Sequence, residues 1–407
     1  MTLPVFDRDN QWIDGLRALA EVHQGNHSLE ALFVPTHDQS QDLLDDTESE
    51  DELEANIDEF QLGNGSQSVI DWSGFNEPQV SAEEEILTQS QVSTTDGVIA
   101  IDAGIIDLGE LASGGVAFAV RGAAVCYPPN NAQPFVCRYN TGALVVDQQN
   151  QLQLFHYMGH RLGQSNLFVN LSPTGGYAAK SSGMSDTPNK IRDRFRNFVE
   201  RIIQEEAVAI LESYGGGILL IDGALSAGTF DTPEPYVRQL LSNARNRGIN
   251  VAAVSKKTRI TVSGRPISSL FAEQPGFVGY APLTQALQQE RQAASANGQT
   301  VRSVAAISVA DQIFAVRFSY APPALTFRAD VHPALGLLPG EVLDRVYNRC
   351  QIYGGYPRPL IECHQYSSFM YQDVQSLLVD IVVRLGVRPQ EEPSMEVLFQ
   401  PFGARFK

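Results

Sequence analysis

The sequence has few cysteines, no long apolar run and no secretory signal pattern. Its four cysteines, Cys126, Cys137, Cys350 and Cys363, form no CxxC pair, so their spacing is unlike that of a zinc site and predicts reduced thiols in or near the core. No window approaches the ~18 uninterrupted apolar residues of a membrane span. The first residues, MTLPVFDRDNQW, lack a basic segment followed by an apolar run. These absences predict a cytoplasmic protein that does not cross a membrane.

Basic residues are scarce in the first quarter of the chain. Residues 1–100 hold 22 acidic and two basic residues, whereas residues 101–407 hold 25 acidic and 27 basic residues. The formal net charge of −18 therefore belongs to the N-terminal quarter. The rest of the chain is nearly neutral, which is compatible with binding nucleic acid, although composition alone does not indicate it.

The sequence does contain enough apolar residues for a full core. With 407 residues, of which 43% are hydrophobic and 19% charged, the chain can form one large domain or two ordinary ones. We expect an acidic N-terminal segment over residues 1–90, an α/β domain over 97–386 and a tail over 387–407.

The N-terminal segment is expected to be partly helical and partly flexible. Residues 1–37 include an amphipathic pattern that predicts a helix. Residues 38–59 are acidic with few large apolar side chains, and such a stretch buries too little surface to offset its chain entropy. We interpret it as a solvated linker, and a DNA-mimicking or partner-binding arm is the alternative.

The pattern from residue 97 onward predicts the α/β class. Apolar β-branched runs ended by Gly, Pro or Asn predict strands, and helical periodicity with a Gly stop signal predicts helices. The expected strands are 98–104, 115–127, 135–146, 217–222, 250–256, 301–310, 312–319 and 325–330; the expected helices are 190–214, 235–248, 339–350 and 371–385; residues 170–189 are expected to form a surface loop. Three strands in a meander, followed by helix, strand, helix and strand, indicate an RNase H-like mixed sheet flanked by helices.

Two aspartates end apolar strands of this pattern. Asp102 follows VIAI and precedes Ala-Gly, and Asp222 follows ILLI and precedes Gly. A carboxylate at the end of a buried strand is costly unless it is paired or binds a metal. A single such Asp would more often cap a turn. Two of them on strands that are neighbours in this fold predict a shared site at one edge of the sheet.

The helix expected at 190–214 supplies a third carboxylate. Glu206 lies near the middle of its apolar face at 100° per residue, while Glu200 and Glu205 lie towards the flanks, with Glu205 as the reserve candidate. A carboxylate on the side facing the sheet needs a partner, which a metal held by Asp102 and Asp222 would provide. The alternative is a boundary Glu that reaches solvent.

One histidine and several basic residues complete the candidate site. His364 lies in YPRPLIECHQYSSF; alone, a His is more often structural than catalytic. Carboxylates with one imidazole favour Mn²⁺, with Mg²⁺ possible. The predicted catalytic and metal-binding residues are Asp102, Glu206, Asp222 and His364. The candidate DNA contacts are Lys256, Lys257, Arg121 and Arg138, although a strand-end charge such as Lys256 can also simply face solvent.

Four segments together resemble the NurA nuclease family. VIAIDAG resembles its first motif, GILLIDGALS its second, VAAVSKKTR its strand-end Lys motif and YPRPLIECHQYSSF its Tyr-Pro…His stretch. The resemblance covers roughly residues 97–386. Ala103-Gly104 stands where Gly-Ser is more usual, and Cys363 stands where Ala is, but neither departure removes a metal ligand.

The resemblance implies a function and partners. It matches Asp102, Asp222, His364 and a Glu of the 190–214 helix to metal-site positions. It implies a Mn²⁺-dependent enzyme that is both a single-strand endonuclease and a 5′→3′ exonuclease. It also implies a homodimer that acts with a HerA-type hexameric translocase in resecting DNA double-strand breaks. Two alternatives remain. An actin-like or sugar-kinase-type ATPase shares the core and an Asp-x-Gly turn, and a non-catalytic adaptor of a DNA motor would lack an intact metal site.

Overall fold

The structure is a computed structural model. It describes residues 32–34, 85–86, 96–111, 115–131, 134–146, 158, 188–227, 231–256, 258, 260–262, 265–272, 274, 276–296, 308–321, 324–385 and 388–389. The helix expected within 1–37 and the acidic stretch 38–59 lie outside the described residues, apart from the short strand at 32–34, and most of the loop expected at 170–189 does as well.

A mixed sheet forms the centre of the fold. Its long central strands are β3 (Gly97–Leu111), β4 (Val116–Tyr127) and β5 (Phe135–Val146), followed along the chain by β6 (Gly217–Asp222), β7 (Ile249–Ser255), β10 (Gly279–Pro282), β11 (Gln312–Arg317) and β12 (Phe327–His332). Short strands β1 (Leu32–Val34), β2 (Glu85–Ile86) and β15 (Arg388–Pro389) join its margins. Two small hairpins pair β8 (Thr261–Val262) with β9 (Arg265–Pro266), and β13 (Ile352–Tyr353) with β14 (Tyr356–Pro357).

The strand order is that of an RNase H-like fold with an antiparallel extension. The strands lie side by side as β5-β4-β3-β6-β7, with β3, β4 and β5 antiparallel and β6 and β7 parallel to β3. Strands β12, β11 and β10 then extend the sheet with antiparallel pairing. The predicted fold class, an RNase H-like mixed sheet flanked by helices, is confirmed.

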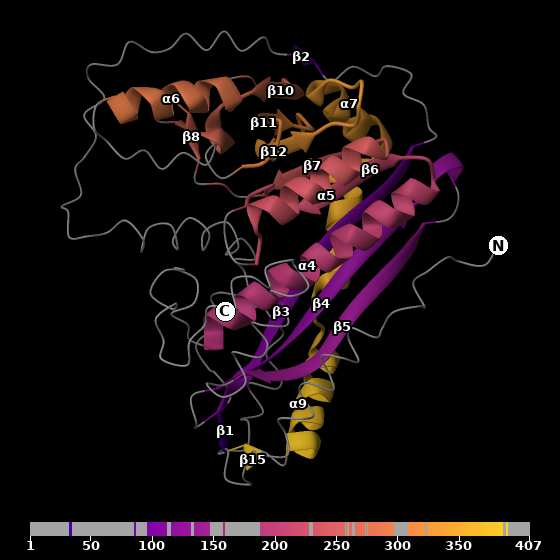
Figure 1. The fold of residues 1–407 in the computed structure, drawn as a ribbon, viewed down its shortest axis with the longest axis vertical. Coiled ribbons are helices and arrows are strands. Elements are labelled where there is room, and N and C mark those ends of the chain that lie inside the picture. Colours follow the sequence, from indigo (N-terminus) through magenta and orange to yellow (C-terminus); the bar gives the residue numbers. More distant parts are fainter. Residues whose placement is uncertain are drawn as a thin grey trace.

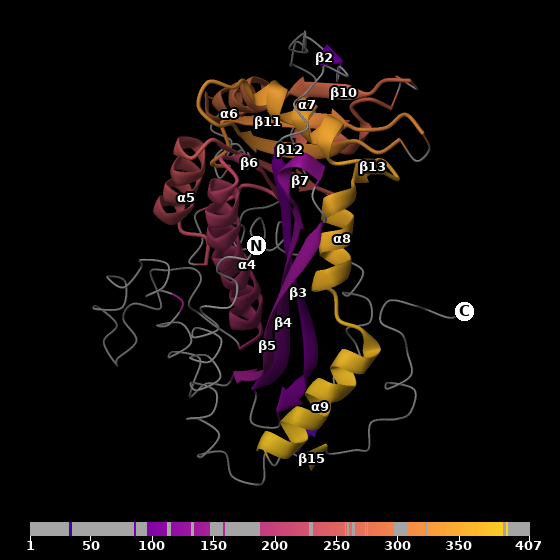
Figure 2. The same ribbon diagram turned by 90° about the vertical axis from the view of Figure 1, so that its right-hand side faces the viewer.

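Helices cover both faces of the sheet (Figures 1 and 2). Helices α4 (Pro188–Ser213) and α5 (Glu234–Asn246) lie on one face, and α7 (Pro339–Arg349) and α8 (Arg358–Ser367) pack on the other. Helix α9 (Tyr371–Leu385) covers the far ends of the long strands, and α6 (Thr284–Ala296) packs beside β11. None of the described helices combines the length and the apolar character needed to span a membrane.

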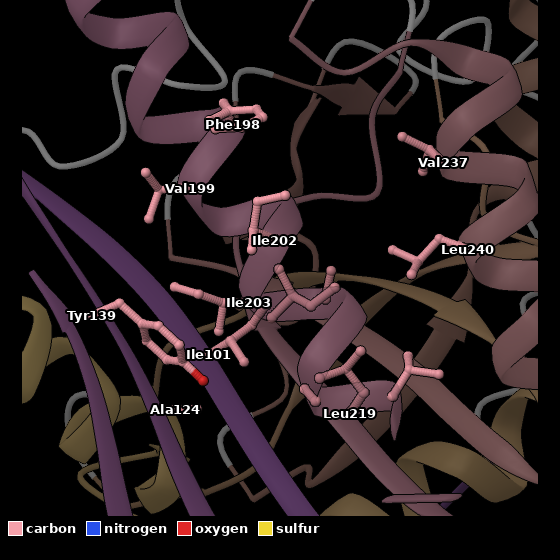
Figure 3. Packing of buried hydrophobic residues seen from close by; sticks show 14 of the residues in the cluster. Ile101, Ala124, Tyr139, Phe198, Val199, Ile202, Ile203, Leu219, Val237 and Leu240 are labelled. Atoms are coloured by element: carbon pink, nitrogen blue, oxygen red, sulfur yellow. The ribbon is translucent and has the colours of Figure 1, made fainter. Parts of the chain in front are cut away.

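Strand alternation determines which side chains meet which helices. Side chains of successive strand residues point to opposite faces. Ile99 and Ile101 therefore pack with α4 and α5, whereas Val98 and Ala100 pack with α7 and α8. Figure 3 shows side chains of α4 and α5 meeting those of the sheet in the first of these cores. The side chains of α4 that are buried in this core are those of Phe195, Phe198, Val199, Ile202 and Ile203.

Several elements differ from the sequence prediction, among them helix α6 and strand β10, which were not expected. The strand expected at 98–104 continues to Leu111, because β3 keeps pairing with β4 past Gly104. Helix α8 was not expected; its first turn accommodates Pro359, since the early N–H groups of a helix need no internal partner. Of the run expected at 301–310, residues 301–307 lie outside the described chain, and 308–310 contribute only an isolated bridge between Ser308 and Ser226.

Candidate metal centre

The two predicted aspartates are brought together by parallel strand register. Ile101 of β3 lies opposite Ile221 of β6, so Asp102 and Asp222 are the next residues on both strands. Both share the parity of Val98 and Ile218, whose side chains pack on the side of α8. The sequence suggested that Asp102 ends its strand, but β3 continues to Leu111. Asp102 lies instead at the level where the neighbouring strand β6 ends.

Helix α8 delivers His364 to the same point. The Nδ1 atom of His364 lies 2.9 Å from Oδ2 of Asp102, and the Ser367 hydroxyl donates to the same oxygen at 2.8 Å. Gly104 allows this approach, because a Cβ at that position would lie 2.6 Å from the Ser367 carbonyl oxygen. Gly104 thus serves packing of α8 on β3, whereas Gly223, at φ 128°, provides the turn after Asp222.

Three predicted ligands form one cluster. Among the described residues, Asp102, Asp222 and His364 each offer a ligand atom within 4.8 Å of the others. Asp102 is buried, and the other two are half-buried. The cluster therefore combines two carboxylates with one imidazole on side chains that are held by a sheet and a packed helix.

The two carboxylates influence each other's protonation. Burial raises the pKa of Asp102, but the hydrogen bond with His364 and the positive charge of Arg196 outweigh it, so this pKa lies below its usual range. Burial and the neighbouring charge of Asp102 raise the pKa of Asp222, and Lys256 offsets part of that rise. Negative charge is thus concentrated in a poorly solvated place, where a cation is favoured.

Tyr356 is a residue of the site that sequence reasoning did not select. Its hydroxyl donates to Oδ1 of Asp222 at 3.0 Å and lies 2.7 Å from the Val254 carbonyl oxygen. The predicted Lys256 donates its ammonium to Oδ2 of Asp222 at 2.6 Å and lies 5.5 Å from the centre of the Tyr356 ring. The signal was present, since Tyr356 begins the Tyr-Pro motif that ends near His364.

Helix α4 reaches the centre where β6 ends. The Nε atom of Arg196 donates to the Ala103 carbonyl oxygen at 2.5 Å, on the side of β3 that β6 no longer pairs. One turn further along, Glu200 is buried and accepts hydrogen bonds from Arg201 at 2.6 Å and Gln204 at 3.1 Å. Burial raises the pKa of Glu200; Arg201 and Arg196 oppose that rise, and Asp102 and Asp222 add to it. Glu200 therefore lies within electrostatic reach of both aspartates.

Glu206, the selected glutamate, is not brought into this cluster. Its Oε2 accepts a hydrogen bond from the Tyr139 hydroxyl of β5 at 2.6 Å. Burial and the charge of Glu206 raise the pKa of Tyr139. Six residues advance a helix by about 9 Å, so Glu206 contacts Tyr139 of β5 at a different place along α4 from Glu200, on which the charges of the aspartates act. The reserve candidate Glu205 accepts from the Tyr236 hydroxyl of α5 at 2.5 Å.

Of the remaining predicted DNA contacts, the structure describes Arg121 and Arg138. Arg121 donates to Asp373 at 2.8 Å, to Asn140 at 2.7 Å and to the Ser368 carbonyl oxygen at 3.0 Å, so it ties β4 and β5 to the α8–α9 junction. Arg138 is exposed, with its guanidinium 4.8 Å from the Tyr366 ring centre. Lys257 lies outside the described residues.

The loop after Asp222 is fixed from the neighbouring strand β12. Oδ2 of Asp330 accepts from the Leu225 amide and from the Ser308 hydroxyl, each at 3.1 Å. Asp330 is itself fully buried and paired with Arg328 through two hydrogen bonds of 2.7 Å. Since a buried carboxylate needs such partners, this network restrains the chain directly behind the metal-site aspartate.

The four cysteines are unpaired, as expected. Cys126, Cys350 and Cys363 are buried and Cys137 is half-buried. The Cys363 thiol, beside His364, lies 3.2 Å from the carbonyl oxygens of Ala100 and Ala123. It therefore fills the contact between α8 and the sheet.

The chain is similar to solved structures of NurA. The NurA nuclease from Sulfolobus solfataricus is 11% identical, with a TM-score of 0.36 over 86% of this chain and 98% of that one. A NurA bound to dAMP and manganese is 11% identical, with a TM-score of 0.33 over 85% and 96%, and a further NurA reaches 0.37 over 84% and 97%. No family model and no curated protein matches the chain. Because these identities and TM-scores are low, the interpretation of the site rests on the chain's own residues.

The donor set fits a divalent cation. Two carboxylates and an imidazole are typical ligands of Mn²⁺, and carboxylates alone also suit Mg²⁺. Burial and the charge of Asp102 raise the pKa of Asp222, so a cation bound here would stabilise its charged form. Asp102, Asp222 and His364 would hold the ion, and the charges of Asp102 and Asp222 also act on Glu200.

Proposed function

We propose that this chain is a metal-dependent nuclease that hydrolyses phosphodiester bonds in DNA. The observation that supports it most is the cluster of Asp102, Asp222 and His364, whose ligand atoms lie within 4.8 Å at the end of β6 in an RNase H-like sheet. Carboxylates positioned in this way are suited to a metal ion that faces a phosphate.

Each residue of the centre has a separate role in this proposal. When bound, a divalent ion supplies a nucleophilic water and stabilises charge on the phosphate. Asp102 and Asp222 would hold the ion, and Glu200, which is buried on α4, would help to orient the attacking water. Lys256 is exposed beside Asp222, so its ammonium is placed to contact a phosphate oxygen.

His364 has two possible roles. Its contact with Asp102 through Nδ1 fixes the imidazole orientation and sets Nε2 as the second functional nitrogen. Nε2 then either acts as a further metal ligand or, when protonated, gives its proton to the leaving oxygen. In both roles Asp102 and Ser367 keep the ring in position.

The motif resemblance extends the proposal to substrate and partners. We propose activity on single-stranded DNA, both as an endonuclease and as a 5′→3′ exonuclease, with Mn²⁺ preferred and Mg²⁺ tolerated. A homodimer that acts with a HerA-type translocase in the resection of double-strand breaks is the corresponding biological setting. The cytoplasm is the expected compartment.

Substrate form tests the proposal. Purified protein is incubated with Mn²⁺ and either linear single-stranded DNA labelled at its 5′ end or circular single-stranded DNA. ATP hydrolysis is measured on the same protein sample. The proposal predicts cleavage of both DNAs, loss of cleavage in Asp222→Asn and no ATP hydrolysis. An Asp222→Asn protein that cuts as well as the wild type would refute the site. ATP hydrolysis without cutting would favour an ATPase.

A further inference from the structure

The β13–β14 hairpin lies directly beside the metal centre. Tyr353 and Tyr356 are opposite each other, joined by Gly354 and Gly355 at φ of 58° and 89°. Two positive φ values are what a tight two-residue hairpin turn requires, and glycine adopts them without strain. Figure 2 shows β13 at the start of α8, next to the ends of the central strands.

The hairpin is anchored at both of its sides. Tyr356 is buried, with its hydroxyl bonded to Asp222 and Val254, and its ring packs at 5.0 Å from that of Phe327. At the base, the Arg358 amide donates to the Gln351 carbonyl oxygen at 3.0 Å, and their side chains bond at 2.9 Å. These contacts give Tyr353 a defined position relative to the metal centre.

Tyr353 itself points into solvent. Its side chain is 71% exposed, whereas Tyr356 opposite is 6% exposed. Within the described part of the chain, no hydrogen bond, ion pair or ring contact involves the Tyr353 side chain. Directly opposite residues of an antiparallel pair have their Cα atoms about 5.5 Å apart, so this exposed ring stands next to the residue that bonds Asp222.

We propose that Tyr353 is a stacking site for an unpaired base of the DNA strand, within a nucleotide or two of the bond to be cut. The inference rests on the proposed nuclease function and specifies how the substrate is held. Lys256, whose ammonium lies 5.5 Å from the centre of the Tyr356 ring, offers a phosphate contact, and Tyr353, the hairpin partner of Tyr356, offers an aromatic face. Cations that follow the backbone, together with aromatic rings that stack bases, are the usual means of binding single strands.

The arrangement predicts a preference for unpaired DNA. A base in a duplex is stacked and paired, so its face is not available to a ring held on a rigid hairpin. A base in a single strand is free to turn onto Tyr353. Stacking is tolerant of sequence because every base has an aromatic face. The site therefore selects strand state and places a phosphate at the metal centre.

Scanning a substrate with single abasic positions tests this site. Binding of labelled oligothymidine is measured by fluorescence anisotropy in EDTA, so that no cleavage intervenes. We expect wild-type affinity to fall about tenfold when one particular nucleotide lacks its base. Tyr353→Ala should bind the intact strand about tenfold more weakly and lose sensitivity at that nucleotide. Tyr353→Phe, which keeps the aromatic face, should behave as wild type.

A matched control and the contrary outcomes complete the test. Leu335 is 69% exposed and lies on the turn after β12, at the end of that strand away from Asp222, so Leu335→Ala should bind as wild type. The stacking site would be refuted if Tyr353→Ala bound the intact strand normally or kept the same sensitivity to the abasic position. In that case, Mn²⁺-dependent cleavage by the wild-type protein would still support the nuclease. A wild-type protein that neither bound nor cut single strands would refute both.

Discussion

Two glutamates of helix α4 lie only six residues apart but have different surroundings. Glu200 is buried with Arg201 and Gln204 and is influenced by the charges of the two aspartates, while Glu206 accepts a hydrogen bond from the Tyr139 hydroxyl. Their chemistry is identical, so only position distinguishes them. Burial raises the pKa of Glu200, Arg201 and Arg196 oppose that rise, and the charges of Asp102 and Asp222 add to it.

This difference predicts which glutamate supports catalysis. Glu200→Gln keeps the size of the side chain but removes its charge, so we expect kcat of DNA cleavage to fall about 10- to 100-fold, as is usual when a group behind a metal ligand is changed. Glu206→Gln is the matched control and should retain nearly full activity. Initial rates with Mn²⁺ measure both variants. Equal loss in the two variants would mean that neither is specific to the centre.

At the scale of elements, the centre depends on the contact between α8 and β3. His364 and Ser367 reach Asp102 only because Gly104 leaves room for the C-terminal turn of α8. The closest atom to an added Cβ is a backbone oxygen, which cannot rotate away. The helix as a whole would have to shift.

Gly104→Ala should therefore disturb both stability and the metal centre. We expect the free energy of unfolding to fall by about 1–3 kcal/mol, as in other overpacked cores, with a parallel loss of Mn²⁺ affinity. Urea denaturation and a Mn²⁺ titration measure the two effects. Gly276→Ala is the control, because a Cβ there meets no atom within 4 Å. An unchanged Gly104→Ala protein would show that α8 does not need this close contact.

A second contact between elements predicts a pH effect. The hydrogen bond from Arg121 lowers the pKa of Asp373 below its ordinary value of 3.8. A lowered folded-state pKa contributes stability that is complete above 3.8 and is lost as the pH falls through the folded value. Asp373→Asn should therefore lower the urea midpoint at neutral pH, and its difference from wild type should shrink below pH 3.8. A difference that stayed constant with pH would contradict this role of the ion pair.

The sequence predicted the strands that carry the aspartates better than the parts around them. Asp102 and Asp222 could be placed together because apolar β-branched runs and their order specify neighbouring parallel strands. Glu200 could not be chosen over Glu206, since helical periodicity does not say how a long helix crosses the sheet. Helix α8 was missed because two prolines near its start resemble a turn. Tyr356 begins a motif that the sequence does show, but the motif does not reveal that its hydroxyl contacts Asp222.

At the scale of the whole molecule, the centre lies where three layers meet. Strands β3 and β6 supply Asp102 and Asp222, α8 supplies His364 from one face, and α4 brings Glu200 and Arg196 from the other face past the end of β6. Because β6 stops at Asp222 while β3 continues, groups on both faces of the sheet reach one point. Elements far apart in the chain thus depend on one another at this site.

The central claim is that this meeting point is a metal centre that cuts DNA. The most direct test is cleavage of end-labelled single-stranded DNA by the full chain with Mn²⁺, Mg²⁺ or EDTA, alongside Asp102→Ala. The account predicts cutting with Mn²⁺, weaker cutting with Mg²⁺, none with EDTA and none by a folded Asp102→Ala protein. Cutting that persists in EDTA or in Asp102→Ala, or no cutting with any metal, would contradict it.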